Sequence, residues 1–193
     1  MTNVPNRTEA FLLLQEYNSN EALIKHALAV EAVMLHFADL LSVPDRDKWG
    51  VIGLVHDLDY EKYPDQHCHK VREILTDRQW PPEYIRAIQS HGWGLCSDIE
   101  PLEKMEKVLY TIDELTGFIA AVSLVRPSKS ILDVAVKSVK KKWKEKGFAA
   151  GVKREVIEEG AKSLGLELDR VIEETIKAMQ KVAEEIGLTG QVN

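Results

Sequence analysis

The sequence predicts an all-α fold in a single domain. Apolar side chains recur at three- and four-residue intervals along most of the 193 residues, which is the period of an amphipathic helix. Segments that contain proline or glycine separate these stretches, and no stretch alternates apolar and polar residues as a half-buried strand would. Because domains commonly run to about 100–200 residues, we expect residues 1–193 to form one domain.

The N-terminal half should contain five helices. The polar residues at 18–20 can cap the second helix, and Pro44 ends it because proline cannot continue the hydrogen-bond ladder. Two prolines at 81–82 precede the fifth helix, and the glycines of 92–94 end it. The expected helices are 7–17, 21–42, 46–57, 66–77 and 83–91.

The C-terminal half should contain four more helices. Pro101 suits the first turn of a long apolar helix, where a missing N–H costs nothing. The last helix carries an apolar stripe that should close the core, and that could instead pair with another subunit to give a homo-oligomer. The expected helices are 101–125, 129–144, 152–163 and 168–187, with Gly165 between the last two.

The charge balance argues against a nucleic-acid partner. The chain has 25 Lys and Arg against 31 Asp and Glu, a formal net charge of -6, so an overall basic footprint is absent. The lysines at 140–146 are more typical of a solvated helix face than of a nucleic-acid site. A metal site could still bring a phosphate ester to this acidic chain, because the charge of the ion dominates locally.

The cysteines and the apolar segments predict a cytoplasmic location. Cys68 and Cys96 form neither a CxxC pair nor a disulfide framework, which is typical of a reducing compartment. The apolar run at 11–14 lacks the length and the cleavage site of a signal peptide. No stretch approaches the roughly 20 apolar residues that cross a bilayer, so we expect no membrane partner.

Histidine and aspartate side chains indicate a metal site. His56 and Asp57 follow one another at the end of an apolar helix, and both are ordinary ligands of divalent transition metals. Neighbouring side chains on a regular helix point about 100° apart, so a helix terminus, where the backbone can bend, lets both reach one ion. The pair alone is weak evidence, because it occurs often by chance.

Two further ligand candidates lie far from this pair in the sequence. His26 has apolar neighbours at helical spacing and lies on or beside a core-facing stripe. Asp113 lies in a segment that is apolar nearly all round, where a carboxylate is costly unless it is paired or bound to metal. A metal would supply the partner that Asp113 needs.

The order His26, then His56 and Asp57, then Asp113 resembles the H…HD…D signature of the HD superfamily, whose members are all-α and mainly metal-dependent phosphohydrolases. The segments HDLDYEKYP, LYTIDELTGFIAA and VKSVKKKWKEKGFAAGVKRE are similar to a bacterial group of predicted HD hydrolases. The resemblance covers about 20–185. It implies an HD-type helical bundle with a core of about 20–125 and a helical extension of about 126–190, and it implies no particular substrate.

The resemblance also implies a second metal position. His67 matches the first extra histidine of the two-metal HD phosphodiesterases, although Val71 replaces their frequent glycine. His91 stands where these enzymes have their next histidine, often a double one, whereas Gly92 follows it here. The alternative is that His67 and His91 line the pocket and bind substrate phosphate. His69 would face away from His67 on a helix and is interpreted as a surface residue.

The ligand set predicts a mechanism. One or two divalent ions (Mn, Fe, Co, Ni, Zn or Mg) would activate water for attack on a small phosphorylated substrate, and Asp57 would bridge them if two are present. Asp59 and Glu61 could orient ligands or carry protons, and exposed loop acids are an equally good interpretation. The candidates for substrate contacts are Lys25, Trp93 and Arg126. For Lys25, a solvated side chain is the simpler interpretation.

Three functions fit these residues. The first is hydrolysis of a phosphate ester, such as a nucleotide, a dinucleotide or another small phosphorylated metabolite. The second is oxygen-dependent cleavage at a di-iron site, which some HD-fold proteins carry out and which His67 and His91 leave open. The third is a non-catalytic nucleotide-binding or regulatory module, against which the intact ligand set argues. The sequence favours the first function.

Overall fold

The computed structural model of the chain describes residues 4–190 and is all-α. Nine α-helices and one short 3-10 helix, η1 (Pro64–Gln66), occur in this range, and its only bridges of β type are two isolated ones. The predicted all-α, single-domain fold is confirmed for these residues. The α-helices are α1 (Arg7–Tyr17), α2 (Glu21–Leu40), α3 (Arg46–Leu54), α4 (Lys70–Asp77), α5 (Pro82–Ser90), α6 (Lys104–Leu124), α7 (Val136–Trp143), α8 (Arg154–Leu164) and α9 (Leu168–Lys181).

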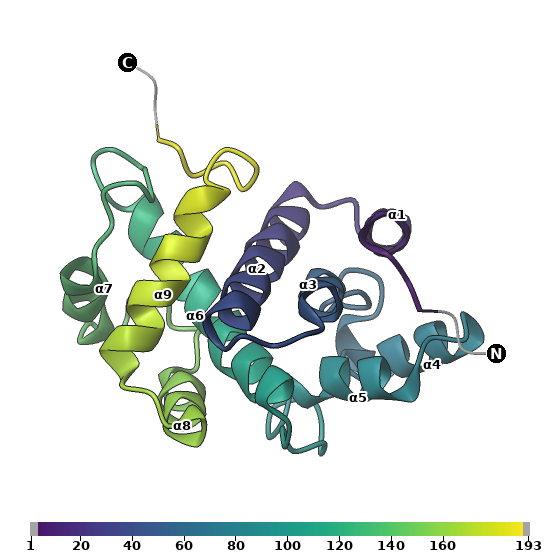
Figure 1. Ribbon diagram of the computed structural model, residues 1–193. Helices are drawn as coiled ribbons and strands as arrows, with labels where there is room; N and C mark the ends of the chain where they lie inside the picture. Colours follow the sequence, from purple (N-terminus) through teal and green to yellow (C-terminus); the bar gives the residue numbers. More distant parts are fainter. Residues whose placement is uncertain (1–3, 191–193) are drawn as a thin grey trace.

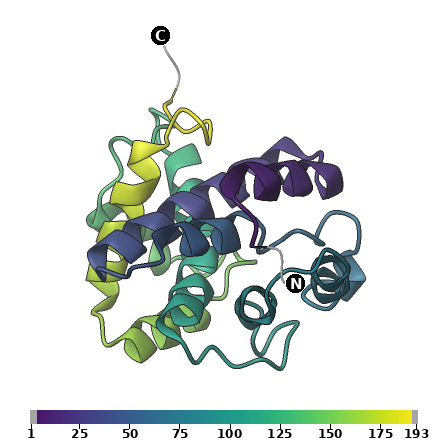
Figure 2. The ribbon, with the colours of Figure 1, turned by 45° about the vertical axis from the view of Figure 1, so that its right-hand side comes forward.

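Helices α2 and α6 pack against each other in the middle of the molecule (Figure 1). On one side, α3 packs on α2 and α5 packs on α6, with α1 and α4 outside them; on the other side, α9 contacts both central helices and α8 lies along α6. The C-terminal helices and the α4–α5 pair lie on opposite sides in the turned view as well (Figure 2). No helix between residues 4 and 190 is both long enough and apolar enough to span a bilayer.

The helical periodicity of the sequence is what builds the core. On α2, Val30, Met34 and Phe37 are completely buried at three- and four-residue intervals, as the amphipathic pattern predicts. On α9, Ile172 and Met179 are also completely buried and join the same hydrophobic core, so this helix closes the core as expected. Residues from both the expected core and the expected C-terminal extension therefore contribute to one apolar interior.

Three expected helices begin three or more residues later than the sequence suggested. Helix α4 starts at Lys70 and not at 66, because Cys68 has a left-handed backbone with a φ of 66°. Helix α6 starts at Lys104 and not at 101. The Glu106 carboxylate accepts hydrogen bonds from backbone N–H groups that precede the helix, and so caps its start. Helix α7 covers only Val136–Trp143 of the expected 129–144, and Lys129 again has a positive φ, of 50°.

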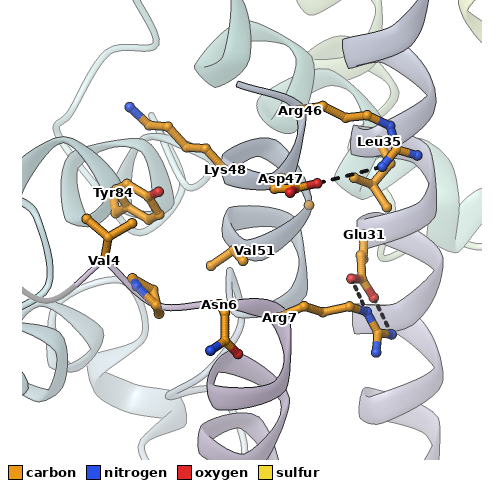
Figure 3. Close-up of a pocket in the computed structure, with 12 residues that line it drawn as sticks. Val4, Asn6, Arg7, Glu31, Leu35, Arg46, Asp47, Lys48, Val51 and Tyr84 are labelled. Carbon is orange, nitrogen blue, oxygen red and sulfur yellow. Dashed lines mark hydrogen bonds and ion pairs between the residues drawn. The ribbon is translucent and has the colours of Figure 1, made fainter. Parts of the chain in front are cut away.

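An ion pair attaches α1 to α2. Arg7 Nε and Nη2 donate to the two carboxylate oxygens of Glu31 at 2.6 and 2.9 Å (Figure 3). Only 4% of Glu31 is exposed, and the pair borders a cavity of about 420 Å³ that also involves α3 and Tyr84. Burial raises the pKa of Glu31, and the hydrogen bond and charge of Arg7 only partly offset this effect.

Gly160 allows α8 to approach α6 closely, since a Cβ at this position would lie 2.1 Å from Thr111 Oγ1 and 3.0 Å from Thr111 Cα. We expect Gly160→Ala to lower the free energy of unfolding by about 1–3 kcal/mol, the usual cost of overpacking. Gly117 on α6 is the control, because an added Cβ meets nothing within 4 Å there. Gly117→Ala should raise stability by roughly 0.5–1 kcal/mol. Urea denaturation measures both changes, and changes of equal sign would contradict the packing argument.

Arg7→Ala should lower the free energy of unfolding by about 1–2 kcal/mol near neutral pH, because it leaves the buried Glu31 carboxylate unpaired. The solvent exposure of Arg7, 56% of its side chain, keeps the loss small. Without Arg7, the folded-state pKa of Glu31 rises further above its unfolded value, so stability falls as pH rises through that pKa. The loss should therefore be smaller at about pH 4 than at about pH 7. The double variant Arg7→Ala/Glu31→Gln should lack this pH dependence in thermal denaturation.

Candidate metal centre

The six side chains predicted as metal ligands meet at one place in the structure. Helix α2 supplies one from its second turn, α6 supplies one from its middle, and the C-terminal end of α5 supplies a third. The other three lie in the irregular segment between α3 and α4. Residues that are far apart in the sequence are therefore brought together by the packing of α2, α3, α5 and α6. The six are His26, His56, Asp57, His67, His91 and Asp113.

The end of α3 explains how two consecutive residues share the site. The helix ends at Leu54, not at 57 as expected, and turns follow it. His56 and Asp57 are thus released from regular helical geometry, and His56 Nε2 lies 3.4 Å from Asp57 Oδ2. On an intact helix their side chains would diverge by about 100°.

Asp57 joins two groups of donors through its two carboxylate oxygens. Oδ2 lies 3.4 Å from His56 Nε2 and 3.8 Å from His26 Nε2. Asp113 Oδ1 belongs to this group, at 2.9 Å from His26 Nε2 and 3.2 Å from His56 Nε2. We call these four residues position 1.

The other oxygen of Asp57 faces the remaining two histidines. Oδ1 lies 3.4 Å from His67 Nε2 and 3.4 Å from His91 Nε2, and these two nitrogens are 3.3 Å apart. We call these three residues position 2. A carboxylate that offers one oxygen to each of two donor groups has the arrangement of a bridging ligand, as the sequence predicted for Asp57 if two ions bind.

Three of the four histidines are held in one tautomer by a hydrogen bond at Nδ1. The partners at Nδ1 are Gly53 O for His56 at 2.8 Å, Asp59 Oδ1 for His67 at 2.8 Å, and Ile88 O for His91 at 2.5 Å. A carbonyl or carboxylate oxygen can only accept, so each Nδ1 carries the proton. Each Nε2 therefore faces the cluster, where it can bind a metal once it has given up any proton of its own.

Asp59 and Glu61, the two loop acids of the sequence analysis, have different places. Asp59 is completely buried and accepts hydrogen bonds from His67 Nδ1 and, at 2.7 Å, from the backbone N–H of Val71, so it orients a ligand. The Glu61 carboxylate instead accepts from the backbone N–H groups of Ser19 and Asn20, at 2.8 and 2.9 Å, at the start of α2. The structure thus gives Glu61 a structural contact and not a place among the ligands.

The charges of the cluster fit a cation. Burial alone would lower the pKa of His56, but the charges of Asp57 and Asp113 raise it well above its usual value. Burial raises the pKa of Asp113, yet the charge of His56 and the hydrogen bond from His26 hold it far below its usual range. His56 Nε2 is fully buried and finds no hydrogen-bond partner within residues 4–190. An orphaned buried nitrogen beside ionised carboxylates is the environment that a divalent metal would satisfy.

The cluster forms the floor of a cleft of about 370 Å³. Five of the six ligand candidates line this cleft, and His56 lies completely buried beneath it. Tyr60 and Glu114 also line it. Among the residues that the structure describes along this cleft, none is lysine or arginine.

The predicted substrate contacts lie outside this cleft. Lys25 lines an adjoining cavity of about 350 Å³ that shares His26 and Gly117 with the cleft, and its Nζ pairs with Glu21 at 2.5 Å. Trp93 packs against the ring of Tyr110, with the ring centroids 5.7 Å apart. Arg126 binds the Asp133 carboxylate through Nε and Nη2, at 2.8 and 3.0 Å. His69 is exposed, as expected.

Sequence reasoning missed the cysteines at the site. The buried Cys68 places Sγ 3.9 Å from His91 Nε2, and the half-buried Cys96 lines the cleft. The side chains of Tyr60 and Cys96 were missed because both lie in irregular segments, where no periodicity reports direction. Only the adjacency of Cys68 to His67 could have indicated a sulfur near the ligands.

Comparisons of this chain with protein-family models, with curated proteins and with solved structures found no match. An assignment of function therefore has to be argued from the residues of the site and their geometry. Several groups of His, Cys and Asp side chains at this site have ligand atoms close enough together to hold a metal ion.

The two positions predict a metal stoichiometry that can be measured. Asp57→Ala should abolish binding at both positions, because each would lose a shared ligand, whereas His67→Ala should leave one ion at position 1. His69→Ala is the matched control for the histidine, since His69 is exposed in the same segment, and Asp65→Ala is the control for the aspartate. Elemental analysis after dialysis counts the ions. Full occupancy in Asp57→Ala would refute the shared carboxylate.

Proposed function

We propose that this chain is a metal-dependent phosphohydrolase of the HD kind that acts on a small phosphorylated substrate. The observation that carries the proposal is the carboxylate of Asp57, which offers one oxygen to each of two donor groups at the floor of an accessible cleft. Two divalent ions held this way would supply an activated water and compensate the charge of the phosphoryl group.

The protein's own contribution is to orient these ligands before any ion binds. The Gly53 and Ile88 carbonyls fix His56 and His91, and the buried Asp59 fixes His67. Partners of this kind are typically worth about 10–100-fold in metal affinity or activity.

The lining of the cleft restricts what can bind there. Because the described residues that line it include neither lysine nor arginine, only bound cations or protonated histidines can balance the negative charge of a phosphate ester. Tyr60 stands edge-on to His67, with the ring centroids 5.2 Å apart, and it is 46% exposed. Its ring therefore offers a wall against which an organic group of the substrate could pack.

The di-iron alternative is supported by the same donor set, because imidazole and carboxylate ligands also suit iron. Oxygen uptake with an iron-loaded protein, in place of phosphate release, would favour that function. The binding-module alternative predicts metal and nucleotide binding without either reaction.

The decisive experiment is a screen of phosphomonoesters and phosphodiesters with the metal-free protein reloaded with Mn²⁺, Co²⁺, Ni²⁺, Fe²⁺, Zn²⁺ or Mg²⁺. We expect phosphate release with at least one ion, loss of turnover on chelation, and recovery when the ion returns. Asp57→Ala should reduce turnover by more than about 100-fold, because it removes a ligand rather than an outer partner. Asp65→Ala, in an exposed part of the same segment, should keep wild-type turnover. Retained turnover in Asp57→Ala would overturn the mechanism.

A further inference from the structure

A sulfur atom lies beside position 2. Cys68 is completely buried, and its Sγ is 3.9 Å from His91 Nε2. Cys68, His67 and His91 each offer one ligand atom, and these atoms all lie within 4.8 Å of one another. Asp57 Oδ1 is 3.4 Å from the same two histidine nitrogens, so these histidines have both an oxygen and a sulfur beside them.

Gly92 makes room for this sulfur. A Cβ at residue 92 would lie 2.4 Å from Cys68 Sγ and 2.3 Å from Cys96 Sγ, so no larger residue fits without displacing both atoms. The two sulfurs therefore fill the space next to His91 that a side chain at residue 92 would otherwise take. The structure thus places Cys68 Sγ at the ligand cluster through a specific close approach.

We propose that the Cys68 thiolate is the fourth protein ligand of position 2, an inference that rests on the metal-dependent function proposed above. Position 2 then has two nitrogens, one oxygen and one sulfur, whereas position 1 has two nitrogens and carboxylate oxygens only. Soft thiolate ligands select borderline ions such as Zn²⁺, Co²⁺ or Fe²⁺ over Mg²⁺ and Mn²⁺, which prefer oxygen. The two positions therefore differ in the ions that they prefer.

The donor separations fit a four-coordinate ion. With metal–nitrogen and metal–sulfur bonds of about 2.0 and 2.3 Å, a tetrahedron places two nitrogens about 3.3 Å apart and a nitrogen and a sulfur about 3.5 Å apart. The observed distances are 3.3 Å between His67 and His91 and 3.9 Å between His91 and Cys68. The nitrogen–nitrogen separation matches this value, and the nitrogen–sulfur separation is a few tenths of an ångström longer.

The proton of the thiol leaves when the ion binds. A coordinated thiol is deprotonated by the charge of the ion, so the proton passes to solvent and the thiolate charge remains on the ligand. Cys96 lines the cleft, whereas Cys68 is completely buried and does not line it. The group of ligand atoms that lie within 4.8 Å of one another includes Cys68 and not Cys96, so we assign the ligand to Cys68.

The test is a Co²⁺ titration of the full-length, metal-free protein under reducing conditions, read by absorption. Thiolate coordination gives a charge-transfer band in the near ultraviolet, which we expect for one of the two bound cobalt equivalents. Cys68→Ser should abolish this band and lower the affinity of position 2 for Zn²⁺ at least about 10-fold relative to Mn²⁺. Cys96→Ser is the matched control and should keep the band.

The outcomes separate this inference from the function on which it rests. Visible cobalt bands without the near-ultraviolet band would overturn the sulfur ligand and leave the metal centre standing. A band that survives Cys68→Ser but is lost in Cys96→Ser would overturn the assignment to Cys68. A protein that binds no cobalt would overturn the metal centre and the sulfur ligand together. X-ray absorption of the wild-type protein is independent of any variant, and it should detect a sulfur at about 2.3 Å from the ion.

Discussion

The shared carboxylate of Asp57 is the constraint on which the rest of the site depends. One oxygen faces His26 and His56 and the other faces His67 and His91, so a shift of this one side chain would disturb both donor groups. A largely buried carboxylate is costly by itself. The bundle satisfies it with histidines from separate elements, so the site depends on the packing of α2, α3, α5 and α6.

Two helix ends repeat the same local device. His56 and His91 each follow the last turn of a helix, and each donates Nδ1–H to the carbonyl oxygen of the residue three positions before it, Gly53 and Ile88. The last carbonyl groups of a helix lack partners within the helix, and its C-terminal end attracts positive charge. The histidines satisfy these carbonyls, and the same contact fixes the orientation of both rings toward the cluster. Local backbone chemistry thus orients two of the six candidate ligands.

The sequence predicted the regular parts of the fold and the six side chains that meet in the cluster. Period and capping predicted α1 with its observed bounds and the buried face of α2, because both are decided by residues close in the chain. The apolar pattern around Cys68 is typical of a helix, but the positive φ of this residue interrupts the helix. Nothing in the sequence therefore indicated that α4 starts later. The pairing of Arg126 with Asp133 was missed for a related reason, because it is set by a turn and not by periodicity.

The charge of the cleft connects metal binding with substrate binding. Carboxylates and histidines line it, and the described lining residues include no lysine or arginine, so a phosphate ester would depend on bound cations or protonated histidines for its attraction. If the ions raise the affinity for phosphate, then phosphate must raise the affinity for the ions by the same factor, because the two binding free energies are linked. If the two positions prefer different ions, phosphate would therefore change the ion affinity of each position by a different factor. Asp57, which belongs to both positions, is the side chain through which one position would sense the occupancy of the other.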